Sequence, residues 1–229
     1  EALCGARLLY NYVWPGGVSH DLPPTFLQRT TEFLDYFEPQ IEEYNQLLTT
    51  NKIFIERSAD VGVMPKEVAI NYGVTGPSLR GSGIPFDLRK TEPYSIYDKF
   101  DFDVPIGEGQ MGTVGDCWDR YYVRVLEMKE SIKILRQALA QIPEGDVQSA
   151  MPKKIRPKKG EIYSRYETAR GDVGFYIRSD GKNIPTRLKM RSPAYCNLSV
   201  LNEISAGWMI SDVITVLGSL DIVLGEIDR

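Results

Sequence analysis

The sequence has little histidine and cysteine. One histidine (His20) and three widely separated cysteines (Cys4, Cys117 and Cys196) occur in 229 residues. None of the usual Cys/His spacings of a zinc site is present, and a histidine-dependent catalytic triad would have a single candidate. An odd, unclustered set of cysteines also argues against a disulfide-stabilised scaffold and fits a reducing compartment. We interpret His20 as a hydrogen-bonded structural residue.

Long apolar runs and excess positive charge are also missing. The most apolar stretch, residues 208–227, is interrupted by Ser211, Asp212, Asp221 and Glu226, whereas a membrane-spanning helix needs about 20 predominantly apolar residues. The net charge of −4 gives no global indication of nucleic-acid binding. No signal peptide is recognisable, and the sequence begins without Met, so we expect it to be part of a longer protein.

The chain contains enough apolar residues, 42%, to build a hydrophobic core. Apolar residues recur at helical spacing over residues 22–50, where Pro39 is expected to divide or kink the helix. A short helix is predicted from Pro65 to just before Gly73. The clearest pattern follows Asp116, the predicted N-cap of a long helix that ends at Pro143. Residues 73–93 and 100–113 are rich in glycine and proline and are predicted to be loops.

Beyond the long helix, the apolar period changes from helical spacing to two. Residues 161–168, 172–179 and 186–191 are predicted to form a three-stranded antiparallel sheet, followed by a helix over 199–218. The expected fold class is α+β, mainly a helical bundle with a small antiparallel sheet. We expect four parts: a helical bundle portion with glycine-rich loops (1–142), a basic linker (143–160), the sheet (161–192), and a C-terminal helix with a tail (193–229).

Two glycine-rich segments resemble phosphate-binding loops. Residues 107–112 match the spacing of a dinucleotide fingerprint, but Pro105 precedes them and no helix starts on the last glycine. Residues 73–83 lack the Gly-Lys-Ser/Thr ending of a phosphate-binding loop. We interpret both segments as loops, the second crossing close to helices. An alternative is that it presents Arg80 to a partner or a buried site.

Charged residues form two further patterns. Asp116, Arg120, Arg124 and Glu127 lie on one stripe of the long helix. This stripe is either a solvated face with the intrahelical pairs Asp116–Arg120 and Arg124–Glu127, or a charged lining inside a larger assembly. The basic run over residues 153–159, together with basic residues of the predicted sheet, favours docking onto an acidic protein neighbour over nucleic-acid binding.

Six motifs, in order along the chain, make the sequence similar to the C-terminal portion of the D-subunit family of proton-pumping NADH:quinone oxidoreductase, respiratory complex I. They are Pro15-Gly-Gly-Val-Ser-His-Asp-Leu-Pro23, Gly76-Pro-Ser-Leu-Arg-Gly-Ser-Gly83, Asp87-Leu-Arg-Lys90, Gly115-Asp-Cys-Trp-Asp-Arg-Tyr121, Ser179-Asp-Gly181 and Asp221-Ile-Val-Leu-Gly-Glu-Ile-Asp-Arg229. The resemblance extends nearly end to end and implies a fold related to the large subunit of nickel–iron hydrogenases.

The resemblance implies that the chain helps to form a quinone-headgroup site beside a neighbouring subunit's iron–sulfur cluster, and so takes part in coupling electron transfer to proton translocation. It implies quinone contacts for Asp221, Val223 and Leu224. Supporting charges would be Arg80, Asp116, Arg120, Arg124, Glu226 and Arg229. The family's quinone-contacting histidine and tyrosine would lie upstream of Glu1.

The resemblance also implies what the chain binds and where it acts. Hydrogenases hold their metals with cysteine thiolates at the positions of Val223 and Glu226, so no metal is expected here. The chain is expected to bind neither NAD nor flavin and to be inactive alone. An iron–sulfur cluster and NADH, or another electron donor, are expected on neighbouring subunits. Expected partners are the cluster-bearing subunit, other peripheral-arm subunits and the membrane arm, on the cytoplasmic side of the cell inner membrane.

Some points stay open at the level of sequence. Many relatives have a histidine where this chain has Leu9, and the electron donor and the quinone type are not specified by any motif. Two other functions are considered: a membrane-bound hydrogenase-related subunit, and a non-catalytic assembly module with the same fold.

Overall fold

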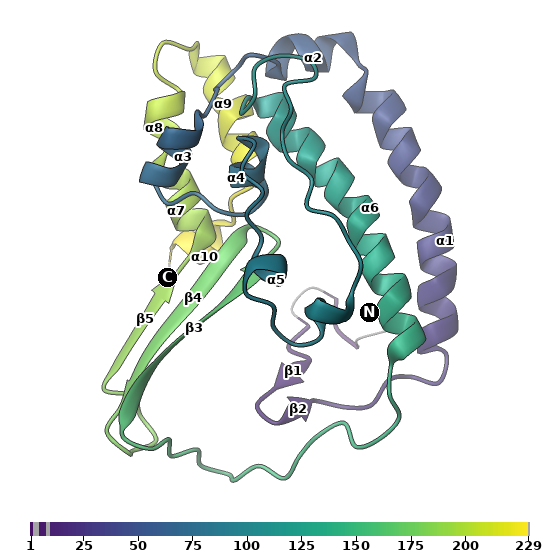
Figure 1. Ribbon diagram of the computed structural model, residues 1–229, viewed down its shortest axis with the longest axis vertical. Coiled ribbons are helices and arrows are strands. Elements are labelled where there is room, and N and C mark those ends of the chain that lie inside the picture. The colour runs from purple at the N-terminus through teal and green to yellow at the C-terminus, as the bar shows by residue number, and fades with distance from the viewer. Residues whose placement is uncertain (2–4, 8–9, 229) are drawn as a thin grey trace.

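Two long antiparallel helices form one side of the molecule (Figure 1). The computed structural model describes residue 1 and residues 5–7 and 10–228. Helix α1 (Phe26–Tyr44) packs against α6 (Cys117–Gln141) through a buried cluster. Its buried members are Leu34, Ile41, Val125 and Ile132. The predicted long helix and its N-cap are confirmed, because the Asp116 side chain accepts a hydrogen bond from the Asp119 amide.

Helix α1 continues through Pro39, so the first expected alternative, division into two helices, is wrong, and the second, a kink, stays a prediction. A proline inside a helix costs about 3 kcal/mol. Here Leu34 and Ile41 are buried on either side of it, and tertiary packing of the apolar face outweighs the local preference. A π-helical turn, η1 (Asn45–Thr49), follows, and then α2 (Lys52–Ser58).

Short helices occupy segments that the sequence pattern indicates only in part. Helix α3 (Lys66–Asn71) is confirmed, and Gly73 follows it with φ +66°. The prediction of loop over residues 73–93 is wrong, because this segment contains α4 (Pro77–Gly81) and α5 (Leu88–Thr91). Residues 100–113 contain no helix or strand, as predicted, and follow the 3-10 turn η2 (Tyr97–Lys99).

The predicted antiparallel sheet is confirmed to within one residue at each strand boundary. Its strands β3 (Gly160–Thr168), β4 (Gly171–Ser179) and β5 (Arg187–Arg191) lie in the order β3-β4-β5. A two-stranded ribbon near the N-terminus, β1 (Val13–Trp14) with β2 (Gly17–Val18), was not expected from the sequence.

The C-terminal region is divided more finely than the sequence predicts. The expected helix over 199–218 is instead three helices, α7 (Pro193–Ser199), α8 (Leu201–Ile204) and α9 (Ile210–Leu220), followed by α10 (Leu224–Ile227). Gly207, with φ +85°, lies in the break between α8 and α9. No helix in the described part of the chain is long and apolar enough to span a membrane.

A second buried cluster joins these C-terminal helices to the middle of the chain. Its most deeply buried members are Met64, Ala69, Val200 and Val216. Together with the two sheets, this arrangement is a mixed α+β fold. The division into four parts and the relation to hydrogenases stay predictions.

Helix α4 depends on a close approach between two segments of backbone. Gly76, its N-cap, has φ +70°, and a Cβ on it would lie 2.6 Å from the Arg170 carbonyl carbon. Neither the left-handed backbone nor the contact with rigid backbone tolerates a side chain.

We predict that Gly76→Ala lowers the free energy of unfolding by about 2–3 kcal/mol, measured by urea denaturation. Gly218→Ala is the matched control, because Gly218 lies within α9 and a Cβ there would meet nothing within 4 Å. This control should be neutral or stabilising by up to about 1 kcal/mol. Equal effects of the two substitutions would contradict the prediction.

Candidate functional site

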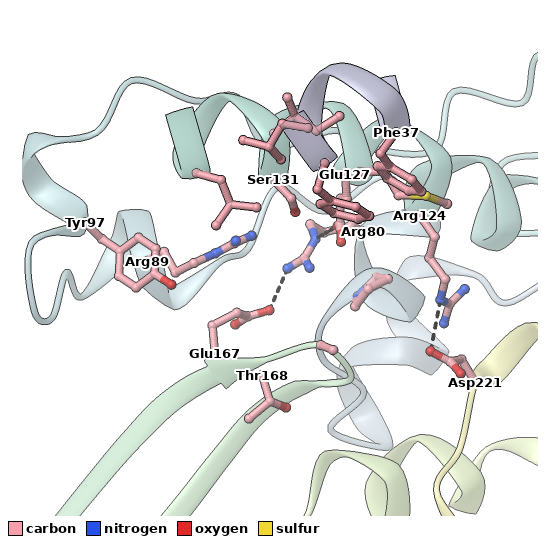
Figure 2. A pocket seen from close by; sticks show the side chains of 17 residues that line it. Phe37, Arg80, Arg89, Tyr97, Arg124, Glu127, Ser131, Glu167, Thr168 and Asp221 are labelled. Carbon is pink, nitrogen blue, oxygen red and sulfur yellow. Dashed lines mark hydrogen bonds and ion pairs between the residues drawn. The ribbon is translucent and has the colours of Figure 1, made fainter. Parts of the chain in front are cut away.

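A cavity of about 510 Å³ lies between α1, α6, α4 and the turn that joins β3 to β4 (Figure 2). One wall is apolar and comes from α1 and α6. It consists of Phe33, Leu34, Phe37, Met128, Ile132 and Leu135. The opposite end is charged and consists of Arg80, Arg89, Arg124, Glu127, Glu167 and Asp221. Such a cavity suits a molecule with an apolar body and a few polar atoms.

Arg80 is the centre of the charged end. Its side chain is only 2% exposed, and it forms ion pairs with Glu127 of α6 (Nε–Oε1 2.6 Å) and Glu167 of β3 (Nη1–Oε1 2.8 Å). Burial alone would lower the pKa of Arg80, but the two carboxylates outweigh burial and raise it. Arg80 therefore stays charged and joins three elements of the fold.

A second buried pair lies beside the first. Asp87, the N-cap of α5, accepts hydrogen bonds from Nη2 and Nε of Arg89 at 2.6 and 3.0 Å. Burial would raise the pKa of Asp87, but the hydrogen bonds and the charges of Arg89 and Arg80 lower it. At Glu167, in contrast, burial dominates and raises the pKa above its ordinary value. The two carboxyl groups thus respond differently to the same cations.

The other end of the charged wall reaches the C-terminal tail. Asp221 ends α9 in a left-handed conformation with φ 52°. Its carboxylate accepts a hydrogen bond from Arg170 (Nη2–Oδ1 3.1 Å) and lies 3.6 Å from Nε of Arg124. Burial lowers the pKa of Arg124 to about 10. Two cations from distant parts of the chain therefore hold the first residue of the tail in place.

The residues of the predicted charged stripe on α6 lie in two different places. Arg80, Arg124 and Asp221 share the cavity, whereas Asp116 and Arg120 lie elsewhere in the core. Asp116 accepts the amide hydrogen bond of Asp60 as well as capping α6. Its burial raises its pKa. A solvated face is therefore wrong for this part of the stripe.

Arg120 is fully buried, and its hydrogen bonds join α6 to two other segments of the chain. It donates to the Gly62 carbonyl at 2.9 Å and to Ser219 Oγ at 2.9 Å. Both expected intrahelical pairs are also wrong: Asp116 forms no ion pair with Arg120 among the described residues, and Glu127 pairs with Arg80 instead of Arg124. Burial lowers the pKa of Arg120.

The remaining predicted residues lie on the tail beyond Asp221. Val223 and Leu224 are 40% and 72% exposed, and Glu226 is half-buried within α10. None of the three lines the cavity. Arg229, and likewise Leu9 and Cys4, lie outside the described residues.

Arg89 and Glu167 line the charged end, and Asp87 and Arg170 lie behind it as ion-pair partners of Arg89 and Asp221. None of these four is among the site residues expected from the sequence. Asp87 had one signal in the sequence, an N-cap residue preceding Leu-Arg-Lys-Thr. Glu167 lies near the end of β3 and Arg170 lies in the turn from β3 to β4, and no local pattern indicates that this turn packs against α4 and the tail.

The glycine-rich segment at residues 107–112 is a loop held by protein groups. The Asp119 carboxylate accepts the Gly109 amide at 3.0 Å and the Gly115 amide at 3.2 Å. An internal carboxylate therefore takes the place that a phosphate would have in a dinucleotide site, which supports the interpretation as a loop. His20 lies outside the cavity and hydrogen-bonds through Nδ1 to Ser19 Oγ at 2.7 Å.

The described residues also form no candidate metal site. Within the described residues, no group of three or more His, Cys, Asp or Glu side chains could hold a metal ion. Cys117 is buried and Cys196 is half-buried, and both are free thiols.

Comparison with known proteins identifies the family. The model of the respiratory-chain NADH dehydrogenase 49 Kd subunit family matches residues 1–159 and 149–229. The chain belongs to this family. The NADH-quinone oxidoreductase D subunit of Chlorobaculum tepidum is 52% identical over 100% of this chain and 58% of the relative. The NADH-quinone oxidoreductase D 1 subunit of Cytophaga hutchinsonii is 51% identical over 100% of this chain and 60% of the relative.

Membership in the 49 Kd subunit family confirms the resemblance inferred from the six motifs. The chain spans about three fifths of the length of these curated relatives. The cavity and the tail described above are therefore features of one part of a subunit of this family.

The Asp87–Arg89 pair allows a test of the charged wall. We predict that Asp87→Asn lowers the free energy of unfolding by about 3–5 kcal/mol at neutral pH, because it leaves buried cations without their carboxylate. Since the folded pKa of Asp87 is lowered, its stabilising contribution is fully present above the unfolded value of about 3.9 and is lost as the pH falls through the folded pKa.

The difference in unfolding free energy between wild type and Asp87→Asn should therefore be constant from neutral pH to about pH 5 and shrink below about pH 4. Urea denaturation across this range measures it. Asp101→Asn, at an exposed carboxylate, is the control and should change stability by less than about 0.5 kcal/mol. A difference that does not depend on pH would contradict the assignment.

Proposed function

We propose that the chain is part of a complex I subunit that forms the quinone-headgroup site, with its C-terminal tail as one wall. The observation that carries this proposal is the construction of the tail. Asp221 is held by Arg124 and Arg170, and after the half-buried Ile222 the apolar side chains of Val223 and Leu224 are exposed. A rigidly anchored, exposed apolar segment is typical of a surface that another group covers.

The chemistry of a quinone headgroup matches this arrangement. Its ring is apolar and its two carbonyl oxygens gain negative charge on reduction. Val223 and Leu224 would contact the ring, while the cations behind Asp221 would supply positive potential near it. Excluding water from such a site strengthens these electrostatic interactions, since their energy rises as the local dielectric constant falls.

In this proposal the chain itself carries no redox centre. Electrons reach the quinone from an iron–sulfur cluster on a neighbouring subunit, and other peripheral-arm and membrane-arm subunits complete the assembly. The subunit would lie peripherally at the inner membrane. Arg80 and its carboxylates act through the fold, because they fix α4 and the β3–β4 turn against which Asp221 is held.

We predict that Val223→Met changes the affinity of the assembled complex for quinone or for a quinone-site inhibitor by about fivefold or more. The longer, flexible side chain would extend into the headgroup site, and one methylene-sized change in a hydrophobic pocket is worth about 1–3 kcal/mol. Steady-state kinetics with varied quinone, and inhibitor titration in membranes, measure the effect.

Ile184→Met is the matched control. Ile184 is 72% exposed and lies on the connection between β4 and β5, so this substitution also replaces an exposed β-branched side chain with Met. Complex content should be unchanged in both variants. Equal inhibitor sensitivity of wild type and Val223→Met would count against the tail as a wall of the quinone site.

The hydrogenase-related alternative makes a different chemical prediction. A nickel–iron centre needs soft thiolate ligands, and the corresponding tail positions here carry Val223 and Glu226. Elemental analysis of the purified, assembled complex should therefore find no stoichiometric nickel. One nickel per complex would favour the alternative, whereas an assembly module would show neither nickel nor any effect of Val223→Met on quinone kinetics.

A further inference from the structure

The outer half of the three-stranded sheet projects away from the helices (Figure 1). The segment from Lys153 to Arg191, which contains this sheet, carries twelve Lys or Arg residues and four Asp or Glu residues. The whole chain nevertheless has a net charge of −4. Positive charge is therefore concentrated in this one segment, and the rest of the molecule is strongly acidic.

Strand register places the exposed cations on one face of the sheet. Arg178 of β4 lies directly opposite Arg187 of β5, and two residues along, Tyr176 lies opposite Lys189. Tyr163 of β3 is paired with Tyr176 on its other side. Directly paired residues point to the same side of a sheet. We call these five residues (Tyr163, Tyr176, Arg178, Arg187 and Lys189) the basic face.

The inner part of the same sheet surface also carries arginine residues, but there a carboxylate neutralises their charge. There, Asp172 pairs with Arg165 at 3.4 Å and with Arg191 at 3.9 Å. Further out, Arg178, Arg187 and Lys189 form no ion pair with any described residue. Glu161 of β3 lies directly opposite Arg178 on the same face, but its carboxylate forms no ion pair with a described residue and accepts a hydrogen bond from the Tyr176 hydroxyl at 2.6 Å.

This arrangement is unfavourable for the isolated fold. Two like charges directly opposite each other on adjacent strands are destabilising. Arg178 and Arg187 also line a surface hollow of about 440 Å³ with Lys159. Asp180 lines the same hollow, but its carboxylate is paired with Lys182 at 3.0 Å. Two guanidinium groups and an ammonium group at one hollow can bind carboxylates with charge-assisted, bidentate hydrogen bonds.

We propose that the basic face binds a carboxylate-rich segment of another protein subunit. The acidic remainder of the chain would repel an extended polyanion such as nucleic acid or an anionic bilayer, whereas a short acidic segment needs only this local patch. The face also combines arginine with tyrosine, and Tyr163 is 53% exposed. These two residue types are enriched at protein–protein interfaces.

A photo-crosslinking aromatic amino acid in place of Tyr163, introduced into the subunit within the assembled complex, tests the proposal. Irradiation should join this position to a peptide of another subunit that carries several Asp or Glu residues within about ten positions. Mass spectrometry of the digested product identifies the peptide. Cross-links to lipid, to nucleic acid, to this subunit alone or to a segment without acidic residues, or no cross-link, would overturn the proposal.

A charge-neutralising pair of substitutions separates binding from folding. In the photo-crosslinking background, Arg178→Gln with Arg187→Gln should reduce the cross-link yield at least fivefold. The same pair should leave the urea-unfolding midpoint of the subunit unchanged or raised, because it removes the repulsion across β4 and β5. A lowered midpoint would assign the two arginines to folding and overturn the proposal.

Lys52→Gln with Lys99→Gln is the matched control. Both lysines are exposed and lie on α2 and η2, outside the segment from Lys153 to Arg191, and the net charge changes by the same amount. The control should keep the cross-link yield within about 20% of the unmodified background. An equal reduction in both double variants would show a general charge effect and contradict a specific site. Neither result depends on quinone kinetics.

Discussion

The guanidinium of Arg80 is buried between carboxylates from distant parts of the chain. Glu127 comes from α6 and Glu167 from β3, and the Phe86 carbonyl accepts a further hydrogen bond at 2.9 Å. Removing one partner of such a buried pair costs about 3–5 kcal/mol because a charge is left uncompensated. The position of α4 relative to the long helices and the sheet therefore depends on this cation. Since the cavity lies between the same elements, its shape depends on Arg80 as well.

The tail is positioned by the same framework. Arg124 follows Arg120 by one turn of α6, yet the two side chains point to different surroundings: one contacts Asp221 and the other lies in the core. Arg170, just after β3, provides the second contact to Asp221. An exposed pair of apolar residues then follows a residue with a constrained left-handed backbone. In the proposed quinone site, this combination would fix the position of the tail while its apolar side chains stay available to a ligand.

The sequence indicated the long regular elements well and the short ones poorly. The apolar repeat of α6 and its Asp116 cap, and the period of two in β3 and β4, are signals carried by each segment on its own. Helices α4 and α5 contain only five and four residues, too short for a periodic pattern. Pro39 is the opposite case: a local signal for a break was overridden by the packing of Leu34 and Ile41 against α6. For the site, Arg80 and Asp221 could be chosen from motifs and Arg124 from the charged stripe of the long helix. Glu167 and Arg170 could not be chosen, because nothing local indicates that the β3–β4 turn packs against α4 and the tail.

By itself, the sequence determined the fold class, the main helices and strands, and the family, since each rests on residue order, apolar period or motif spacing within short segments. Only the tertiary structure decided which charges meet. Asp116 and Arg120 share a stripe with Arg124 and Glu127 in sequence, but burial assigns the first two to the core and the others to the cavity. The physical reason is that a buried charge needs a partner, and that partner is supplied by whichever distant segment the packing brings into contact.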